Sequence, residues 1–155
     1  MSAKVLLLGS KGVVGSEILK KLIDTYSLEH YDHDSLDVTN FNLVEKVIRN
    51  CKPKFIINCA AYTNVDQAQS NAKLCYQINS IAVKNLSEIC RIYDCKLIHL
   101  STDYVFDGMK ETPYIETDKM NPLNIYGKSK SRADNYIFES GCSYIIFRTS
   151  WVYGQ

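Results

Sequence analysis

Residues 5–15 have the sequence VLLLGSKGVVG, in which a continuous apolar run ends at a glycine and two further glycines follow. An apolar run of this length is typical of a strand that is buried on both faces of a parallel sheet. Gly9, Gly12 and Gly15 then lie where the first strand passes into the first helix, which is where nucleotide-binding turns occur. The stretch therefore predicts an α/β fold with a nucleotide site.

Strand and helix patterns alternate along the rest of the chain. Strand-like runs occupy residues 28–32, 55–59, 96–101 and 144–147, and apolar residues at helical spacing occupy 18–23, 40–50, 71–93 and 126–140. Such alternation predicts right-handed βαβ crossovers and a doubly wound parallel sheet with helices on both faces. We predict one Rossmann-like NAD(P)-binding domain over residues 1–155. Because no closing helix follows strand 144–147, we expect the N-terminal part of something longer.

Composition limits the classes of partner. The chain has 155 residues, of which 46% are hydrophobic, and its 18 basic residues balance 17 acidic ones, so we expect neither nucleic acid nor a membrane surface as a partner. Six cysteines include no C-x-x-C pair and lie mostly in apolar patterns, which predicts buried free thiols. The first apolar run is too short for a signal peptide or a membrane span, and we predict a cytoplasmic protein without a metal site.

Each glycine of the turn has a predicted role. A side chain at Gly9 would obstruct the tight turn, one at Gly12 would hold the backbone away from a pyrophosphate, and one at Gly15 would separate helix from strand. The start of the helix offers backbone N–H groups and positive potential, so Lys11, Val13 and Val14 join the predicted cofactor contacts. An ordinary strand-to-helix turn is the alternative. A P-loop is excluded because no Gly-Lys-Ser/Thr ending follows.

Asp32 lies 17 residues beyond Gly15, at the end of the second predicted strand. A carboxylate there can accept hydrogen bonds from an adenosine ribose and repel a 2′-phosphate, which favours NAD. Lys11 and His33 could offset that repulsion, so NADP stays open. A solvated turn residue is the alternative role for Asp32.

Tyr126 and Lys130 are four residues apart, which on a helix places a phenol and an ammonium on one face. A fixed cation stabilises a phenolate, so we expect Lys130 to lower the pKa of Tyr126 and make it a proton donor near neutral pH. With 11 tyrosines in the chain, about one Tyr-x-x-x-Lys match arises by accident. The surrounding sequence must therefore decide whether Tyr126 and Lys130 are a catalytic pair. The alternative is a pair on the surface of a helix.

Six ordered blocks resemble the dTDP-4-dehydrorhamnose reductase family, a group of extended short-chain dehydrogenases/reductases. The matching blocks are residues 9–15, 36–39, 58–66, 101–108, 122–130 and 148–154. The resemblance implies a catalytic trio of Thr102, Tyr126 and Lys130, with both hydroxyls facing the substrate carbonyl and Lys130 also binding the nicotinamide ribose. It implies NADPH or NADH as cofactor.

The same resemblance implies further contacts. Asp37 and Val38 would contact adenine, and residues 60–63 would line the nicotinamide side; these four are Ala60, Ala61, Tyr62 and Thr63. Asn79 matches an asparagine of the family, with a helix-surface amide as the alternative. The implied substrate contacts are Val65, Thr102, Asp103, Tyr104 and Trp151. A core position is the alternative for Val65, Tyr104 and Trp151.

The implied reaction is reduction of the 4-keto group of a dTDP-4-dehydro-6-deoxyhexose in dTDP-L-rhamnose biosynthesis. The implied partner is a nucleotide-sugar substrate, with a homodimer as a candidate state of the full-length form. The resemblance implies a C-terminal substrate part that continues well past residue 155 and is absent from this chain, so we expect weak or no turnover by the chain alone. The alternatives are a nucleotide-sugar epimerase or dehydratase, a regulatory subunit of the same fold like the β subunit of methionine adenosyltransferase, and a degenerate reading frame or fragment.

Overall fold

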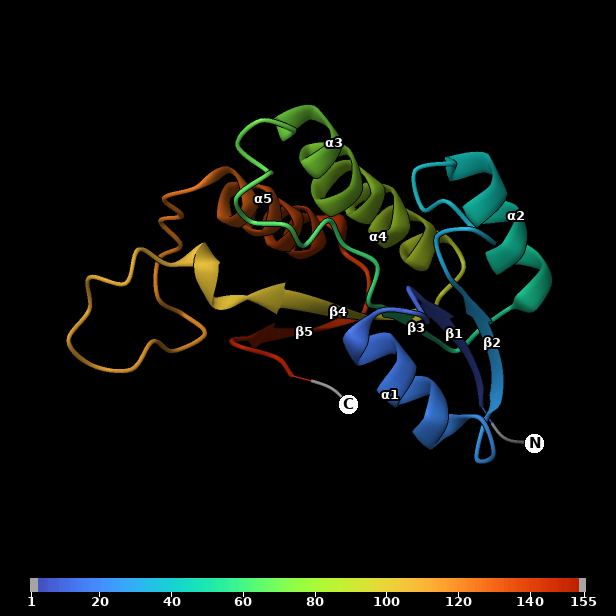
Figure 1. Ribbon diagram of the computed structural model, residues 1–155. Coiled ribbons are helices and arrows are strands. Elements are labelled where there is room, and N and C mark those ends of the chain that lie inside the picture. The colour runs from blue at the N-terminus through green and yellow to red at the C-terminus, as the bar shows by residue number, and fades with distance from the viewer. Residues whose placement is uncertain (1–2, 154–155) are drawn as a thin grey trace.

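The computed structural model describes residues 3–153, which form a five-stranded sheet flanked by helices (Figure 1). Neighbouring strands follow the order β2-β1-β3-β4-β5, and every neighbouring pair is parallel. The strands are β1 (Lys4–Leu8), β2 (Ser27–Tyr31), β3 (Phe55–Asn58), β4 (Lys96–Thr102) and β5 (Tyr144–Thr149). This is the doubly wound α/β fold predicted from the sequence. Gly154, the last residue of the final matching block, lies outside the described residues.

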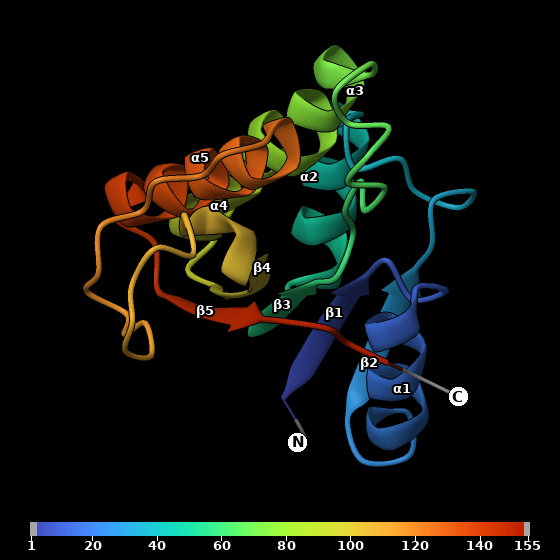
Figure 2. The same ribbon diagram turned by 60° about the vertical axis from the view of Figure 1, so that its left-hand side comes forward.

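Helices cover the two faces of the sheet unequally. Among the described residues, α1 (Val13–Leu22) lies on one face, while α2 (Phe41–Cys51), α4 (Ala82–Ile92) and α5 (Ile125–Ser140) lie on the other (Figure 1). Two views show α4 and α5 side by side over β4 (Figures 1 and 2). The predicted helices on both faces are thus present, and the Lys130 side chain of α5 points toward β4.

The core divides along the faces of the sheet. Leu6 and Leu8 of β1 belong to the larger cluster, which packs under α2, α4 and α5, while Val5 and Leu7 belong to the smaller cluster under α1. Successive strand residues point to opposite faces, so a strand buried on both faces must be apolar throughout. This explains the continuous apolar run at residues 5–8.

The predicted long helix at residues 71–93 contains a wider turn. It consists of α3 (Ala72–Tyr76), the π-helical segment η1 (Gln77–Ile81) and α4. In this segment Asn79 and Ser80 are buried, and the Ser80 hydroxyl donates a hydrogen bond of 2.7 Å to the carbonyl of Ser129 in α5. A π turn inserts one extra residue per turn, and here it directs these two polar side chains at α5.

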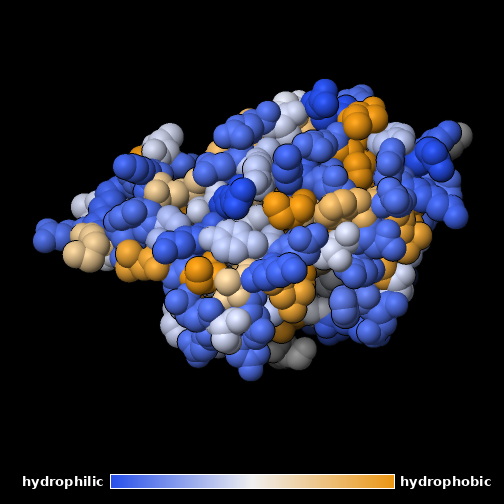
Figure 3. Space-filling model, turned by 90° about the horizontal axis from the view of Figure 1, so that it is seen from above, coloured by the Kyte–Doolittle hydropathy of each residue, from blue (hydrophilic) through white to orange (hydrophobic). Residues whose placement is uncertain are grey.

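The outer surface differs between the helical layer and the last strand. Seen from above, the layer of α2 to α5 is largely hydrophilic with apolar residues scattered between (Figure 3). At edge strand β5, by contrast, Ile145 and Phe147 are 39% and 51% exposed. All six cysteines are free, and all but Cys59 are buried, as predicted. Within residues 3–153, no helix has both the length and the apolar character to cross a membrane.

Candidate functional site

The glycine turn joins β1 to α1, and two of its glycines are needed for packing. Gly9 has a φ of +80°, and a Cβ there would lie 2.6 Å from the backbone nitrogen of Ala60. A Cβ at Gly15 would run into the carbonyl oxygen of Gly9. Gly12 is exposed, and its Cβ would meet Gly9 O at 3.4 Å, so its predicted closeness to a pyrophosphate stays a prediction.

A cleft of about 510 Å³ lies at the carboxyl ends of β1, β2 and β3. This is where the strand order reverses, the usual ligand position in open α/β sheets. Ten of the predicted cofactor residues line it: Gly9, Lys11, Gly12, Asp32, Asp37, Val38, Ala60, Ala61, Tyr62 and Thr63. Val13 and Val14 lie in the first turn of α1, beside the cleft and not among its lining residues. The volume of the cleft fits a dinucleotide, and the small lining residues Gly12, Ala60 and Ala61 leave room for one.

Charged groups at this cleft are paired with one another. Lys11 Nζ lies 2.5 Å from Asp32 Oδ2 and 3.1 Å from Asp34 Oδ2. The hydrogen bond from Lys11, followed by those from Ser35, holds the pKa of Asp32 below its usual range. At the adjacent Asp37, Oδ1 accepts 2.8 Å hydrogen bonds from the backbone and side chain of Thr39. Lys11 therefore stands beside Asp32, where it can offset the negative charge.

Asn79 supports the cleft from behind. Its Oδ1 accepts from Tyr62 N at 2.8 Å, and its Nδ2 donates to Tyr62 O and to Ser129 Oγ, both at 3.0 Å. The side chain is 1% exposed, so it is not the surface amide of the alternative. These bonds use the amide within the protein and join the Tyr62 end of the cleft to α5. A direct cofactor contact by Asn79 stays a prediction.

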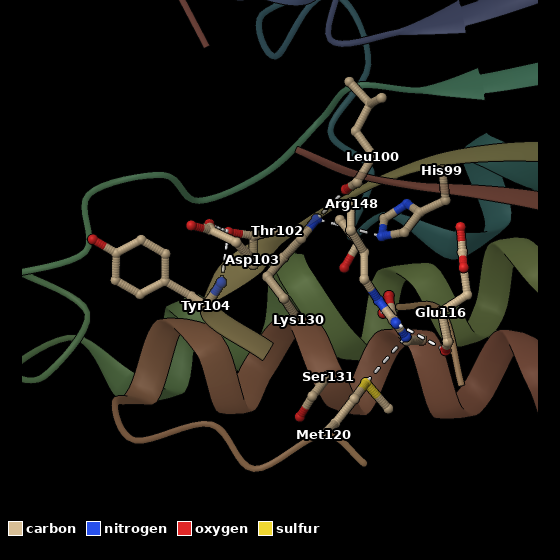
Figure 4. A network of polar contacts seen from close by, with 12 residues as sticks. His99, Leu100, Thr102, Asp103, Tyr104, Glu116, Met120, Lys130, Ser131 and Arg148 are labelled. Carbon is tan, nitrogen blue, oxygen red and sulfur yellow. Dashed lines mark hydrogen bonds and ion pairs between the residues drawn. The ribbon is translucent and has the colours of Figure 1, made fainter. Parts of the chain in front are cut away.

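Helix α5 carries Tyr126 and Lys130 on one face, as the spacing predicted. Asn124 caps the helix, since its Oδ1 accepts a 2.7 Å hydrogen bond from Gly127 N. Lys130 is 2% exposed, and its Nζ donates to Leu100 O at 2.5 Å and lies 3.3 Å from His99 Nε2 (Figure 4). The surface-pair alternative is excluded, because the lysine reaches inward to β4.

The pKa of Tyr126 does not move in the expected direction. Burial raises it above its ordinary value of 10.0, and hydrogen bonding with Thr102 lowers it by less. Burial also lowers the pKa of Lys130 to about 8. The pKa of Tyr126 is therefore raised overall, and our expectation of a lowered value is wrong. The Lys130 amine is directed at β4, and desolvation of the buried phenol sets the direction of the shift.

Predicted substrate contacts gather beyond the end of β4, in a second cleft of about 350 Å³. Asp103, Tyr104 and Trp151 line this cleft, and Trp151 is 78% exposed. Thr102 is buried next to them, and its Oγ1 donates to Asp103 Oδ1 at 3.0 Å and accepts from Tyr104 N at 3.2 Å. The rings of Tyr104 and Tyr126 form a T-shaped pair with centroids 5.8 Å apart. Val65 is half-buried and is not among the residues that line either cleft.

Arg148 of β5 ties the segment before α5 to the sheet. Its guanidinium donates to Asp134 Oδ2 at 3.1 Å and to the carbonyl of Glu116 at 3.3 Å, with Met120 beside it (Figure 4). Asp134 is fully buried, one helical turn after Lys130. The pairing holds α5 against β5, one helical turn beyond Lys130.

Two residues of the site, Asn58 and His99, were missed at the sequence level. His99 is fully buried in β4 beside Lys130, and Asn58 lies next to it at the end of β3. The available signal was a histidine between apolar residues in a predicted strand, Ile98 and Leu100. A buried polar side chain requires a partner, and here the partner is a predicted catalytic group.

A family model, curated relatives and solved structures all point to one protein family. Residues 3–155 match the family model described as the RmlD substrate binding domain. The chain is 40% identical to a dTDP-4-dehydrorhamnose reductase from Aggregatibacter actinomycetemcomitans over an alignment of length 155, which covers 99% of the chain and 53% of the relative. It thus spans about half the length of the curated relatives it matches.

Solved structures match over the same half. A dTDP-4-dehydrorhamnose reductase from Bacillus anthracis, in complex with NADP, superposes with a TM-score of 0.97 and 38% identity, covering 100% of this chain and 56% of that one. Another, from Clostridium acetobutylicum, gives a TM-score of 0.93 and 39% identity, covering 97% and 54%.

Proposed function

Because the chain belongs to the RmlD substrate binding domain family, we propose that it supplies the cofactor site and the proton-transfer groups of a reductase. The reaction is reduction of the 4-keto group of dTDP-4-dehydrorhamnose, with NADPH or NADH, in dTDP-L-rhamnose biosynthesis. The observation that carries this proposal is the arrangement of Thr102, Tyr126 and Lys130 at the end of β4, next to a cleft lined by ten predicted cofactor residues. Similarity to reductases over the whole described half supports it.

The nicotinamide would supply the hydride, and the residues of the chain would manage the proton. As the substrate carbonyl becomes an alkoxide, Tyr126 donates its phenolic proton to that oxygen. Thr102 turns its hydroxyl from Asp103 to the same oxygen and stabilises the developing charge. The raised pKa of Tyr126 keeps the phenol protonated, as a donor must be, until the alkoxide forms.

The position of Lys130 suits two tasks. Its ammonium form would stabilise the Tyr126 phenolate after proton donation, and its amine would bind a ribose hydroxyl and so orient the nicotinamide. Cys59, which lines the cofactor cleft, is near enough to influence the pKa of Lys130. The buried amine therefore lies at the border between the cleft and the catalytic groups.

The cofactor cleft supports binding of both dinucleotides. Asp32 can accept hydrogen bonds from a ribose diol, and Lys11 can bind a 2′-phosphate once it leaves the two carboxylates. The similar Bacillus anthracis reductase was solved with NADP. A cytoplasmic location and a homodimer of the full-length form belong to the same proposal.

The test is cofactor oxidation with dTDP-4-dehydrorhamnose. We expect substrate-dependent oxidation of NADPH when this chain is joined to the remaining half of its Aggregatibacter relative, and little turnover by the chain alone. The intact relative is the positive control, and cofactor binding by the chimera shows that the cleft has formed. A chimera that binds NADPH yet oxidises none of it with substrate, and that captures a stable protein partner instead, would favour the regulatory alternative.

A further inference from the structure

Asn58, His99 and Lys130 form a buried chain of polar contacts beneath the catalytic groups. Asn58 and His99 are register partners on the neighbouring strands β3 and β4, so their side chains project on the same face, toward α5. Asn58 Nδ2 lies 3.2 Å from His99 Nδ1, and His99 Nε2 lies 3.3 Å from Lys130 Nζ. In Figure 4, dashed lines join the lysine amine to the His99 ring and to the carbonyl of Leu100. All three side chains are less than 5% exposed.

The first contact of this chain fixes the orientation of the Asn58 amide. The backbone nitrogen of Ala60 donates a 3.1 Å hydrogen bond to Asn58 Oδ1. A backbone N–H can only donate, so the oxygen of the amide must face Ala60 and its NH₂ group must face His99.

The amide in turn fixes the tautomer of the imidazole. Because the Asn58 NH₂ group donates, His99 Nδ1 must accept, and the single hydrogen of a neutral ring then sits on Nε2. The ring is neutral because full burial, and next the charge of Lys130, hold the pKa of His99 well below its ordinary value of 6.5. The hydrogen on Nε2 points at Lys130 Nζ.

The lysine therefore meets one acceptor and one donor. One amine hydrogen goes to Leu100 O. A neutral amine offers its lone pair to the His99 Nε2–H and keeps one hydrogen for another partner. An ammonium would instead set two donors against each other, or force the ring and amide to turn and leave the buried Ala60 N–H without an acceptor.

We propose that Asn58 and His99 are positioning residues that set the proton affinity of Lys130: Asn58 holds the imidazole hydrogen on Nε2, and this hydrogen opposes a third proton on the amine. The inference rests on the proposed function, because that function gives Lys130 its task. It assigns a tuning role to two residues that need not touch substrate or cofactor.

Other groups also face Lys130. Asp134 lies one helical turn further along α5 and pairs with Arg148 of β5, while Cys59 and Cys75 approach from the end of β3 and from α3, and Tyr126 lies one turn earlier. Burial lowers the pKa of Lys130 to about 8, and Asp134, Cys59 and Cys75 oppose that lowering. None of these groups fixes the His99 tautomer. A change at Asn58 therefore tests the effect of the imidazole on the pKa of Lys130 separately from the effects of these groups.

The direct test is the tautomer of His99 in this chain, measured by long-range ¹H–¹⁵N NMR with labelled histidine. The chain has 3 histidines, and His30 and His33 are exposed, so one buried signal is expected. We expect the hydrogen on Nε2 at about pH 9, above the Lys130 midpoint of about 8, where the amine is neutral. A hydrogen on Nδ1, or a protonated ring, in the unmodified chain would overturn the proposal without any variant.

The near-isosteric change Asn58→Asp should reverse the ring. One carboxylate oxygen still accepts from Ala60 N, while the other replaces the NH₂ group and requires the hydrogen on Nδ1. Nε2 then accepts from Lys130, whose titration midpoint should rise by about one pH unit, the effect of one hydrogen bond.

The control for the new negative charge is Asn58→Asp combined with His99→Phe, which lacks the imidazole. If the tautomer is responsible, Asn58→Asp moves the Lys130 midpoint much less without the imidazole. An equal rise in both backgrounds assigns the effect to charge and overturns the proposal. These readouts need no turnover, so absence of reductase activity would contradict the proposed function and leave the tautomer result to stand on its own.

Discussion

Two regions of the site each present a lysine, and their surroundings make the two amines chemically different. Lys11 in the glycine turn has a side chain 71% exposed and stands between two carboxylates, and hydrogen bonds to Asp32 and then Asp34 raise its pKa above 10.5. Lys130 in α5 is 2% exposed and faces a carbonyl and an imidazole, and burial lowers its pKa to about 8. Lys11 is thus a permanent charge for binding, while Lys130 can exchange a proton near neutral pH.

The largest expected effect tests the buried region. Tyr126→Phe removes the proton donor, and we expect hydride transfer to fall about 10²- to 10⁴-fold in the chimera with the relative's second half. Cofactor affinity should stay within a few-fold, because the cofactor cleft is lined by other residues. Single-turnover oxidation of NADPH measures the rate of hydride transfer, and fluorescence titration measures the affinity for the cofactor. Equal turnover by Tyr126→Phe would remove the role given to the phenol.

The next effect is on stability and depends on pH. Since the pKa of Lys130 falls from 10.5 to about 8 on folding, the unfolded chain binds more protons than the folded one between these values. The free energy of unfolding should rise with pH over this window, by about 3 kcal/mol in total. Denaturant unfolding of the chain and of Lys130→Met at several pH values isolates this contribution. Parallel pH profiles for the two proteins would show that Lys130 titrates normally.

A smaller effect tests the glycine turn, with a matched control beside it. Gly9→Ala forces a side chain into a left-handed conformation and against Ala60, so we expect a loss of about 2 kcal/mol or more. Gly12→Ala has a nearest contact of 3.4 Å and no positive φ, and its unfolding midpoint should stay close to that of the unmodified chain. Thermal unfolding compares the two, and similar losses would contradict the difference in packing.

The smallest effect concerns Lys11. In Lys11→Ala the dissociation constant for NADPH should rise a few-fold, while that for NADH changes less, because one cation near the expected 2′-phosphate is lost. Exposed charges are screened, so raising the salt concentration should reduce the difference. Lys20→Ala, which removes an exposed lysine paired with Glu17 on α1, is the control. An equal change for both cofactors would argue against a role in their discrimination.

Local rules explain what could be predicted from the sequence. A run such as residues 5–8 has few conformations available, and glycines at fixed spacing after it imply a turn whose steric reasons recur here at Gly9 and Gly15. Helical spacing placed Tyr126 and Lys130 on one face of α5. These inferences need only neighbours in sequence, and most of the cofactor residues they predict line one cleft at the carboxyl ends of β1, β2 and β3.

The features that were missed depend on contacts between distant segments. The π turn at Asn79 follows from partners 17 and 50 residues away, Tyr62 and Ser129. We predicted the wrong direction for the pKa shift of Tyr126, because the spacing of residues on a helix does not show how deeply their side chains are buried. His99 had no visible partner until β3, β4 and α5 were assembled.

The comparison between the two lysines can be measured in one experiment. Titration of the chain with ¹³C-labelled lysine, assigned with Lys11→Ala and Lys130→Met, follows the Cε signal of each amine through its own midpoint. We predict a midpoint near pH 8 for Lys130 and one above 10.5 for Lys11. If both amines titrate together above pH 10, burial does not lower the pKa of Lys130, and the proposed difference between the two lysines is contradicted.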